Sequence, residues 1–172
     1  MADGGQMQPM EFVPGPKTSR VLRDALGQFA TGVTLVTIQS SDGPMGFAAN
    51  SFAAVSLDPA LVLWSPAKSS QRYVHYLAAR QYAIHVLPRH AQDLLGRFVR
   101  GGPGFDGLEF TLSPDDVPLL DNALARFECR QHAVHDGGDH AIIVGEVLRA
   151  AYQPGAPLVF SQGQYGGFTP TG

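Results

Sequence analysis

Three consecutive residues, Lys68, Ser69 and Ser70, combine an ammonium group with two hydroxyl groups. They follow an apolar run at residues 61–64 and precede a segment with helical spacing, which predicts a junction between a strand and a helix with the serines as caps. A helix N-terminus offers unpaired N–H groups and the positive end of the helix dipole. The junction is therefore a candidate phosphate site, and the alternative is a serine cap beside a solvated lysine.

A second stretch that could bind a ligand covers residues 46–56, which read Gly-Phe-Ala-Ala-Asn-Ser-Phe-Ala-Ala-Val-Ser. Small residues in an extended chain let the backbone lie close to a flat ligand, and Asn50 and Ser51 add polar groups to an apolar run. The alternative is a buried strand in which Asn50 caps a turn. Together with the phosphate candidate, this stretch suits a ligand with a planar ring at one end and a phosphate at the other.

A third candidate is the tripeptide Gly138-Asp139-His140 at a predicted hairpin turn. A neutral imidazole of His140 held there can orient a second ligand over the ring, with Asp139 fixing the tautomer. A turn histidine that is merely exposed is the alternative.

Other motifs do not carry a function. Residues 102–107 match the pattern Gly-x-Gly-x-x-Gly, but a helix rather than a strand precedes them and Pro103 lies inside, so a dinucleotide-binding fold is rejected. His132 and His135 are three residues apart on a predicted strand, which directs them to opposite faces, so we expect no metal site. Neither a Gly-x-Ser-x-Gly nor a His-Glu-x-x-His hydrolase motif is present.

The composition limits the partners. The chain has 172 residues, a formal charge of −3 and only 16% charged residues, which leaves no basic face for nucleic acid and no polybasic membrane patch. With 44% hydrophobic residues and few charges, we expect a second copy to cover apolar surface in a homodimer. Cys129 is the only cysteine, read as a small buried side chain, and no export signal is apparent, so a cytoplasmic location is expected.

The elements that must position these residues are mostly strands. Residues 1–18 are predicted to be a flexible tail, and an amphipathic helix capped by Ser19 should lead into one domain over residues 19–172. Further helices are expected at about 71–79 and 91–99, a glycine-rich loop at 100–107 and irregular structure at 108–122. Strands are predicted at residues 33–39, 45–50, 52–57, 61–64, 82–87, 123–135, 140–152 and 157–160.

Because strands outnumber helices throughout, a mainly β fold with peripheral helices, built as a β-barrel, fits better than a parallel α/β sheet. The first four strands follow one another closely, which suggests an antiparallel meander or barrel.

The chain resembles the flavin reductase-like family, which has the FMN-binding split-barrel fold and includes the small reductase components of two-component flavin monooxygenases. The resemblance runs in order from about Ser19 to Phe168. The matching segments are residues 29–37 (FATGVTLVT), 49–59 (ANSFAAVSLDP), 61–64 (LVLW), 68–70 (KSS), 127–129 (FEC), 137–140 (GGDH), 145–147 (GEV), 157–160 (PLVF) and 163–166 (GQYG).

The resemblance implies a split β-barrel, a dimer with flavin sites near the subunit interface, and a set of site residues. His140 would place the nicotinamide of NADH or NADPH, and Tyr165 would lie near the same opening of the flavin site. Ala48 stands where similar proteins usually have threonine, so one hydroxyl contact to the ring is absent. The residues implied to contact FMN or FAD are Thr31, Gly32, Val33, Thr34, Ala48, Ala49, Asn50, Ser51 and Phe52 along the ring system, and Lys68, Ser69 and Ser70 at the phosphate.

The implied activity is hydride transfer from a nicotinamide to a flavin, in which the cofactors supply the chemistry and the protein supplies stacking, distance and charge. The reduced flavin would pass to a partner monooxygenase. Two alternatives stay open, a flavin-binding electron carrier or storage protein without turnover, and a structural barrel without a ligand.

Overall fold

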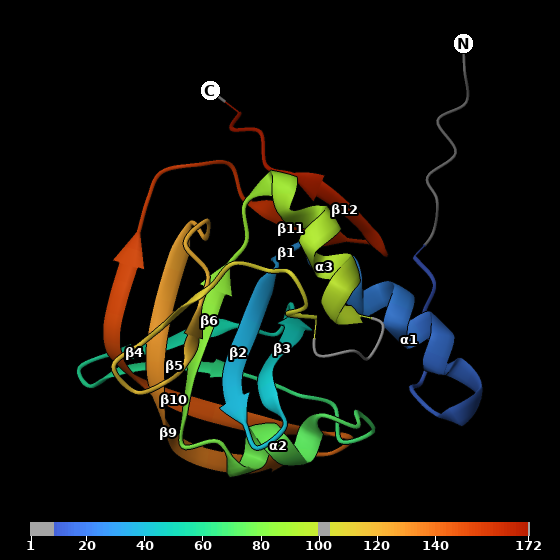
Figure 1. The fold of residues 1–172 in the computed structure, drawn as a ribbon. Helices are drawn as coiled ribbons and strands as arrows, with labels where there is room; N and C mark the ends of the chain where they lie inside the picture. Colours follow the sequence, from blue (N-terminus) through green and yellow to red (C-terminus); the bar gives the residue numbers. More distant parts are fainter. Residues whose placement is uncertain (1–8, 100–103, 172) are drawn as a thin grey trace.

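The computed structural model describes residues 9–99 and 104–171 (Figure 1). Residues 1–8 of the predicted tail and 100–103 of the predicted glycine-rich loop lie outside the described residues, and so does the start of the rejected Gly-x-Gly-x-x-Gly match. The described chain is mainly β with three short α-helices, as predicted.

Seven antiparallel strands form the main sheet, in the order β3-β2-β6-β9-β10-β5-β4. Two long strands pair along their length and make its centre, and the predicted start and end of the second of them are confirmed. The strands are β2 (Thr34–Ser40), β3 (Gly43–Ala49), β4 (Ala53–Leu57), β5 (Ala60–Trp64), β6 (Gln81–Val86), β9 (Ala125–Gly137) and β10 (His140–Tyr152).

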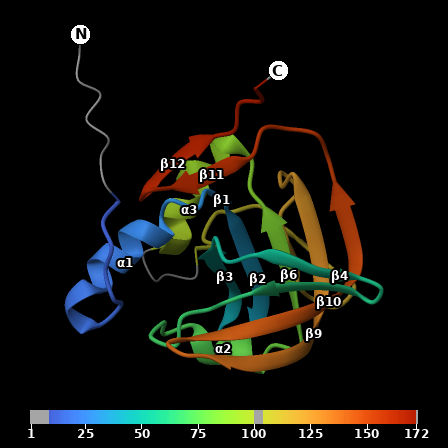
Figure 2. The same cartoon turned by 180° about the vertical axis from the view of Figure 1, so that it is seen from behind.

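The two edges of this sheet are neighbours in sequence. β3 and β4 lie at opposite ends of the strand order, yet only Asn50, Ser51 and Phe52 separate them. Because so short a link spans at most about 14 Å, the sheet must curl until its edges approach. Figures 1 and 2 show this curl, with β4 and β5 crossing the layer formed by β2, β3 and β6. Of the two arrangements predicted for the first four strands, an antiparallel meander or a barrel, the meander does not hold, because β2 pairs with β6 and β3 does not pair with β4.

The inside of the curled sheet holds one hydrophobic core. Helix α2 (Tyr73–Ala78) packs against it at one end of the molecule, where the Tyr76 hydroxyl donates a hydrogen bond to the Val36 carbonyl at 2.9 Å. Trp64 and Cys129 are buried there, as predicted for the cysteine. The core residues are Val36, Ile38, Met45, Val62, Trp64, Tyr76, Tyr82, Ile84, Cys129 and Ile143.

A second core lies on the outer side of β2 and β3, under helix α3 (Gln92–Val99). Phe98 is fully buried there against Gly46 and Leu35. A three-stranded sheet of β1 (Thr31–Gly32), β11 (Leu158–Ser161) and β12 (Gln164–Gly167) lies beside it, and only the middle strand of the three was predicted separately. The remaining short elements are the 3-10 helix Arg89–Ala91 and strands β7 (Thr111–Leu112) and β8 (Pro118–Leu119).

The second core leaves no room for a side chain at Gly46. A Cβ atom at Gly46 would lie 2.4 Å from the Phe98 ring, so we expect Gly46→Ala to lower the free energy of unfolding by about 2 to 3 kcal/mol. Gly96→Ala in α3 is the matched control, because nothing lies within 4 Å of its Cβ position and alanine favours a helix by up to about 1 kcal/mol. Urea denaturation measures both, and equal stability of the two variants contradicts the assignment.

His85 on β6 joins two distant segments inside the protein. Its Nδ1 lies 3.1 Å from the Leu35 carbonyl, and its Nε2 accepts a hydrogen bond from the Leu120 N–H at 3.1 Å. Because a carbonyl only accepts and an N–H only donates, the ring is the neutral tautomer with its proton on Nδ1. Burial lowers the pKa of His85 from about 6.5 to about 4.

This shift predicts a loss of stability in acid. Between pH 6.5 and 4 the unfolded chain binds a proton at this histidine that the folded protein excludes. The free energy of unfolding therefore falls as the pH falls through this window, and the contribution of neutral His85 is fully present above it. The shift corresponds to about 3 kcal/mol. We expect His85→Gln to flatten the dependence of the free energy of unfolding on pH in this window, measured by denaturation at several pH values, and an unchanged slope contradicts the prediction.

The N-terminal segment packs loosely on this body. Helix α1 (Ser19–Leu26) follows a 3-10 turn at Pro16–Thr18 and buries none of its residues, and Leu26 and Phe29 are exposed. The helix begins at Ser19 itself, with Thr18 at the cap position, so the prediction of Ser19 as the cap is wrong by one residue. Within the described residues no helix combines the length and the apolar character needed to cross a membrane.

Candidate functional site

A small cleft of about 140 Å³ brings the early and late parts of the chain together. One wall comes from the start of β2 and the end of β3, and the other from the hairpin of β11 and β12. Its lining residues are Val33, Ala48, Ala49, Asn50, Phe160 and Tyr165. The predicted ring residues 48–50 and the predicted Tyr165 therefore meet at one place.

Local pairing explains how these residues are held. The Thr34 hydroxyl donates a hydrogen bond of 2.8 Å to the Ala49 carbonyl, so Thr34 supports the β3 wall and its hydroxyl is already engaged. On the other wall the Phe160 and Tyr165 rings lie 5.2 Å apart in a tilted arrangement. Gly32 and Thr31 pair β1 with β11, opposite Val159 and Phe160, and the buried Thr31 hydroxyl has no hydrogen-bond partner among the described residues.

The next two predicted residues are engaged in other contacts. Ser51 Oγ accepts a hydrogen bond from the Ser65 N–H at 2.9 Å, and the Phe52 ring stacks on Phe127 at 5.6 Å. The Ser51 contact ties the link between the sheet edges to the start of the segment that carries Lys68. Lys68 follows Ser65 by three residues, a separation of at most about 11 Å, so the predicted phosphate site begins close to the cleft.

Lys68 is paired with Asp136 at the end of β9. This hydrogen bond raises the pKa of the lysine and lowers that of Asp136. Ser69 is exposed, and the Ser70 hydroxyl accepts a hydrogen bond from the Arg72 N–H at 3.3 Å. Helix α2 begins at Tyr73 with Arg72 at the cap position, so the predicted capping by Ser69 and Ser70 is wrong, and this short helix adds little dipole.

His140 opens β10 and lies beside Lys68. Its Nδ1 is 2.7 Å from the Asp139 carboxylate, the hydrogen bond that lowers the pKa of Asp139. Ala67 forms a bridge with His140, and the Lys68 N–H donates to the Asp139 carbonyl at 2.9 Å. The structure thus groups His140 with the lysine and Tyr165 with the cleft, and the expectation that His140 and Tyr165 share one opening stays a prediction.

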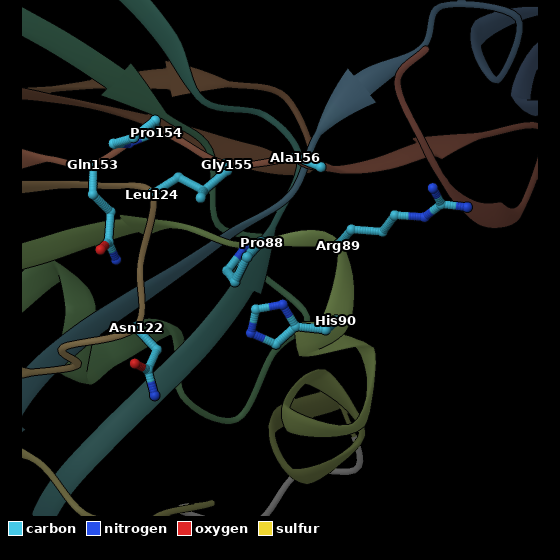
Figure 3. Close-up of a pocket in the computed structure, with 9 residues that line it drawn as sticks. All are labelled: Pro88, Arg89, His90, Asn122, Leu124, Gln153, Pro154, Gly155 and Ala156. Atoms are coloured by element: carbon cyan, nitrogen blue, oxygen red, sulfur yellow. The ribbon is translucent and has the colours of Figure 1, made fainter.

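A larger hollow of about 720 Å³ lies elsewhere (Figure 3). His90, Asn122 and Gln153 surround it, whereas the side chain of Arg89 extends away from them, toward Gly167 on β12. None of the predicted site residues lines this hollow. The larger of the two hollows is therefore not the one lined by the residues whose chemistry suggests a function.

Comparison with known proteins assigns the family. The family model "Flavin reductase like domain" matches residues 26–169, most of the chain. The chain belongs to the flavin reductase-like family. The FMN reductase (NADH) SmoA of Agrobacterium fabrum is 55% identical to this flavin reductase-like protein over 158 residues, covering 92% of this chain and 91% of that one.

Other relatives agree. The reductase subunit HsaB of a flavin-dependent monooxygenase of Mycobacterium tuberculosis is 38% identical, over 88% of this flavin reductase-like protein and 83% of HsaB. A solved structure of the NADH:FAD oxidoreductase of Streptomyces globisporus, in complex with NAD and FAD fragments, superposes with a TM-score of 0.85 at 35% identity, covering 94% and 99% of the two chains. The predicted split-barrel fold class of this flavin reductase-like protein is confirmed.

Sequence reasoning missed two residues of this site. Phe160 was placed on a strand but not at a ligand, and the signal was its position across a tight turn from Tyr165. Asp136 was read only as part of a hairpin turn, and its partner Lys68 is 68 residues away in the chain. Such a separation leaves no local pattern for Asp136.

Proposed function

We propose that this protein is an NADH-dependent flavin reductase that transfers a hydride from the nicotinamide to FMN or FAD. The observation that carries the proposal is the cleft in which Ala48, Ala49 and Asn50 lie with Phe160 and Tyr165. The hydrogen bond from the Ser65 N–H to Ser51 Oγ ties the chain next to this cleft to the segment that leads to Lys68. The names of the relatives, an NADH-dependent FMN reductase and an NADH:FAD oxidoreductase, support the same reaction and favour NADH over NADPH. The flavin and the nicotinamide supply the redox chemistry when they are bound.

The residues of the chain bind and orient. Ala48 and Ala49 leave their backbone accessible to a flat ring, and the exposed Asn50 amide donates hydrogen bonds where negative charge gathers on that ring. Lys68, Ser69 and Ser70 supply the cation and hydroxyls for a phosphate. His140, whose orientation Asp139 fixes, supports the nicotinamide.

The proposal includes a homodimer. The cleft volume of about 140 Å³ is well below the roughly 300 Å³ at which ligand pockets begin, so a second copy is needed to complete the site. Strand β4 is an edge strand with exposed apolar residues, Val55 and the 95% exposed Leu57, and such an edge needs a cover. Tyr152 on β10 is also 89% exposed. Light scattering coupled to size-exclusion chromatography tests this, and a monomer contradicts it.

The reduced flavin is proposed to pass to a partner monooxygenase, as the name of HsaB suggests for that relative. A cytoplasmic location is also part of the proposal, because NADH and a single cysteine suit a reducing compartment.

The decisive experiment mixes the purified protein with NADH and an excess of FMN and follows the absorbance at 340 nm. We expect continuous loss of the NADH signal that depends on the flavin, with FAD and NADPH compared in parallel. The competing function, a flavin carrier or store, has the same phosphate contacts but predicts flavin binding without NADH consumption. A structural barrel predicts neither binding nor turnover.

A further inference from the structure

We propose that Asp136 occupies, in the free protein, the place at Lys68 that the flavin phosphate takes on binding, and that this competition keeps flavin affinity low. The inference rests on the proposed function, because it concerns how the same site binds and releases FMN. The Asp136 carboxylate accepts a hydrogen bond from the Lys68 ammonium. Lys68 is the only cation among the three residues predicted to bind the phosphate. A phosphate oxygen makes the same kind of contact with a lysine as a carboxylate oxygen.

The position of Asp136 does not depend on this ion pair. The β9–β10 hairpin is joined to the segment before α2 by backbone hydrogen bonds from the Lys68 N–H to the Asp139 carbonyl, at 2.9 Å, and from the Ala141 N–H to the Pro66 carbonyl, at 3.1 Å. The bridge between Ala67 and His140 adds to them. The fold therefore holds the hairpin that carries Asp136 next to the segment of Lys68, so that the carboxylate can return to the lysine after it has been displaced.

The pair is easily displaced. The side chains of Lys68 and Asp136 are 38% and 79% exposed, and ion pairs between solvated side chains contribute little to stability. Asp139 places a second carboxylate on the same turn, where its partner is His140. An incoming phosphate dianion thus meets two negative charges beside one lysine, which lowers its affinity.

This arrangement fits an enzyme that must release its product. A reductase that hands reduced flavin to another protein cannot hold it tightly, and an internal carboxylate that returns to the lysine favours departure. Asp136 is in this sense an affinity-setting residue, and it takes no part in hydride transfer.

The test is Asp136→Asn, which keeps the shape of the side chain and removes its charge. FMN and riboflavin are titrated into the protein and followed by the change in flavin fluorescence. We expect FMN to bind about three- to tenfold more tightly to the variant, from the Coulomb energy of a dianion a few ångströms from one charge in a solvated site. Riboflavin, which lacks the phosphate, should bind both proteins equally, and the gain for FMN should shrink in about 0.5 M salt.

Glu146→Gln is the matched control. Glu146 lies on the same hairpin in an exposed ion pair with Arg130, at 2.7 Å, so this variant has the same net charge as Asp136→Asn but an unchanged phosphate site. Its affinity for FMN should equal that of the wild type, and tightening equal to that of Asp136→Asn would reduce the effect to net charge and overturn the proposal.

Unchanged or weaker FMN binding by Asp136→Asn, or an equal gain for riboflavin, also overturns it. NADH oxidation by the wild type separates this outcome from the proposed function. If the wild type turns over and FMN binds Asp136→Asn no more tightly, only the role of Asp136 fails. If the wild type binds FMN without consuming NADH, the reductase assignment fails while a tighter variant still supports the competition.

Discussion

Replacing Gly145 by alanine should lower the free energy of unfolding by about 3 kcal/mol or more, a large part of the stability of a typical domain. Gly145 lies on β10 at a register shift between β9 and β10. A Cβ atom there would lie 2.0 Å from the Tyr82 hydroxyl and 3.1 Å from Cys129 Cβ. Tyr82 is almost fully buried in the core, so the ring has no room to move away. Urea denaturation measures the loss.

Two variants check the cause. Gly15→Ala should leave stability nearly unchanged, because no atom lies within 4 Å of its Cβ position. Tyr82→Phe removes a buried hydroxyl that has no hydrogen-bond partner in the described structure, so by itself it should cost little. Combined with Gly145→Ala it should recover part of the lost stability, since the closest clash is gone. Strict additivity of the two changes would show that the hydroxyl is not the obstacle.

Replacing His140 by alanine should reduce kcat/KM for NADH by about 100-fold, the size of effect expected when a reactant is misplaced by an ångström. The imidazole is held by Asp139 at 2.7 Å, and its side chain is 43% exposed, so it is open to a second ligand. Flavin affinity should change little, because Lys68, Ser69 and Ser70, the proposed phosphate residues, are unchanged. Initial rates of NADH oxidation at saturating FMN give the value.

The neighbours of His140 supply the controls. Asp139→Asn keeps the histidine but weakens its orientation, so we expect a smaller loss in kcat/KM, about tenfold. His135 is an exposed histidine on the same hairpin, and His135→Ala should leave the rate unchanged. A similar loss in His135→Ala and His140→Ala would mean that the hairpin, and not this imidazole, matters.

The alternation of side chains and the turn residues predicted most of the strands. β10 begins and ends where it was expected, because Gly138 with its positive φ of 78° marks the hairpin and the β-branched residues Ile142, Ile143 and Val144 follow it. The helix caps were less accurate. Ser19, Ser69 and Ser70 are residues of a type that caps helices, but α1 begins at Ser19 itself, and α2, whose Tyr76 is anchored in the core, begins only at Tyr73.

The candidate site was predictable only in pieces. Asn50, Lys68, His140 and Tyr165 carry chemical groups that the sequence displays, and the resemblance to a family named them together. The structure places His140 beside the segment of Lys68 and Tyr165 in the cleft with Asn50, and whether His140 and Tyr165 serve one site stays a prediction. The small size of Gly46 suggested room for a ligand, and the structure assigns that room to the Phe98 ring.

The sequence by itself determined the local elements and the family, because side-chain periodicity, turn residues and short motifs are properties of neighbouring residues. Only the tertiary structure decided that β3 and β4 are the two edges of one curled sheet, that Phe160 faces Asn50, and that Asp136 reaches Lys68. These contacts join residues dozens of positions apart, and the free energy that selects them comes from burying a common core and pairing strands.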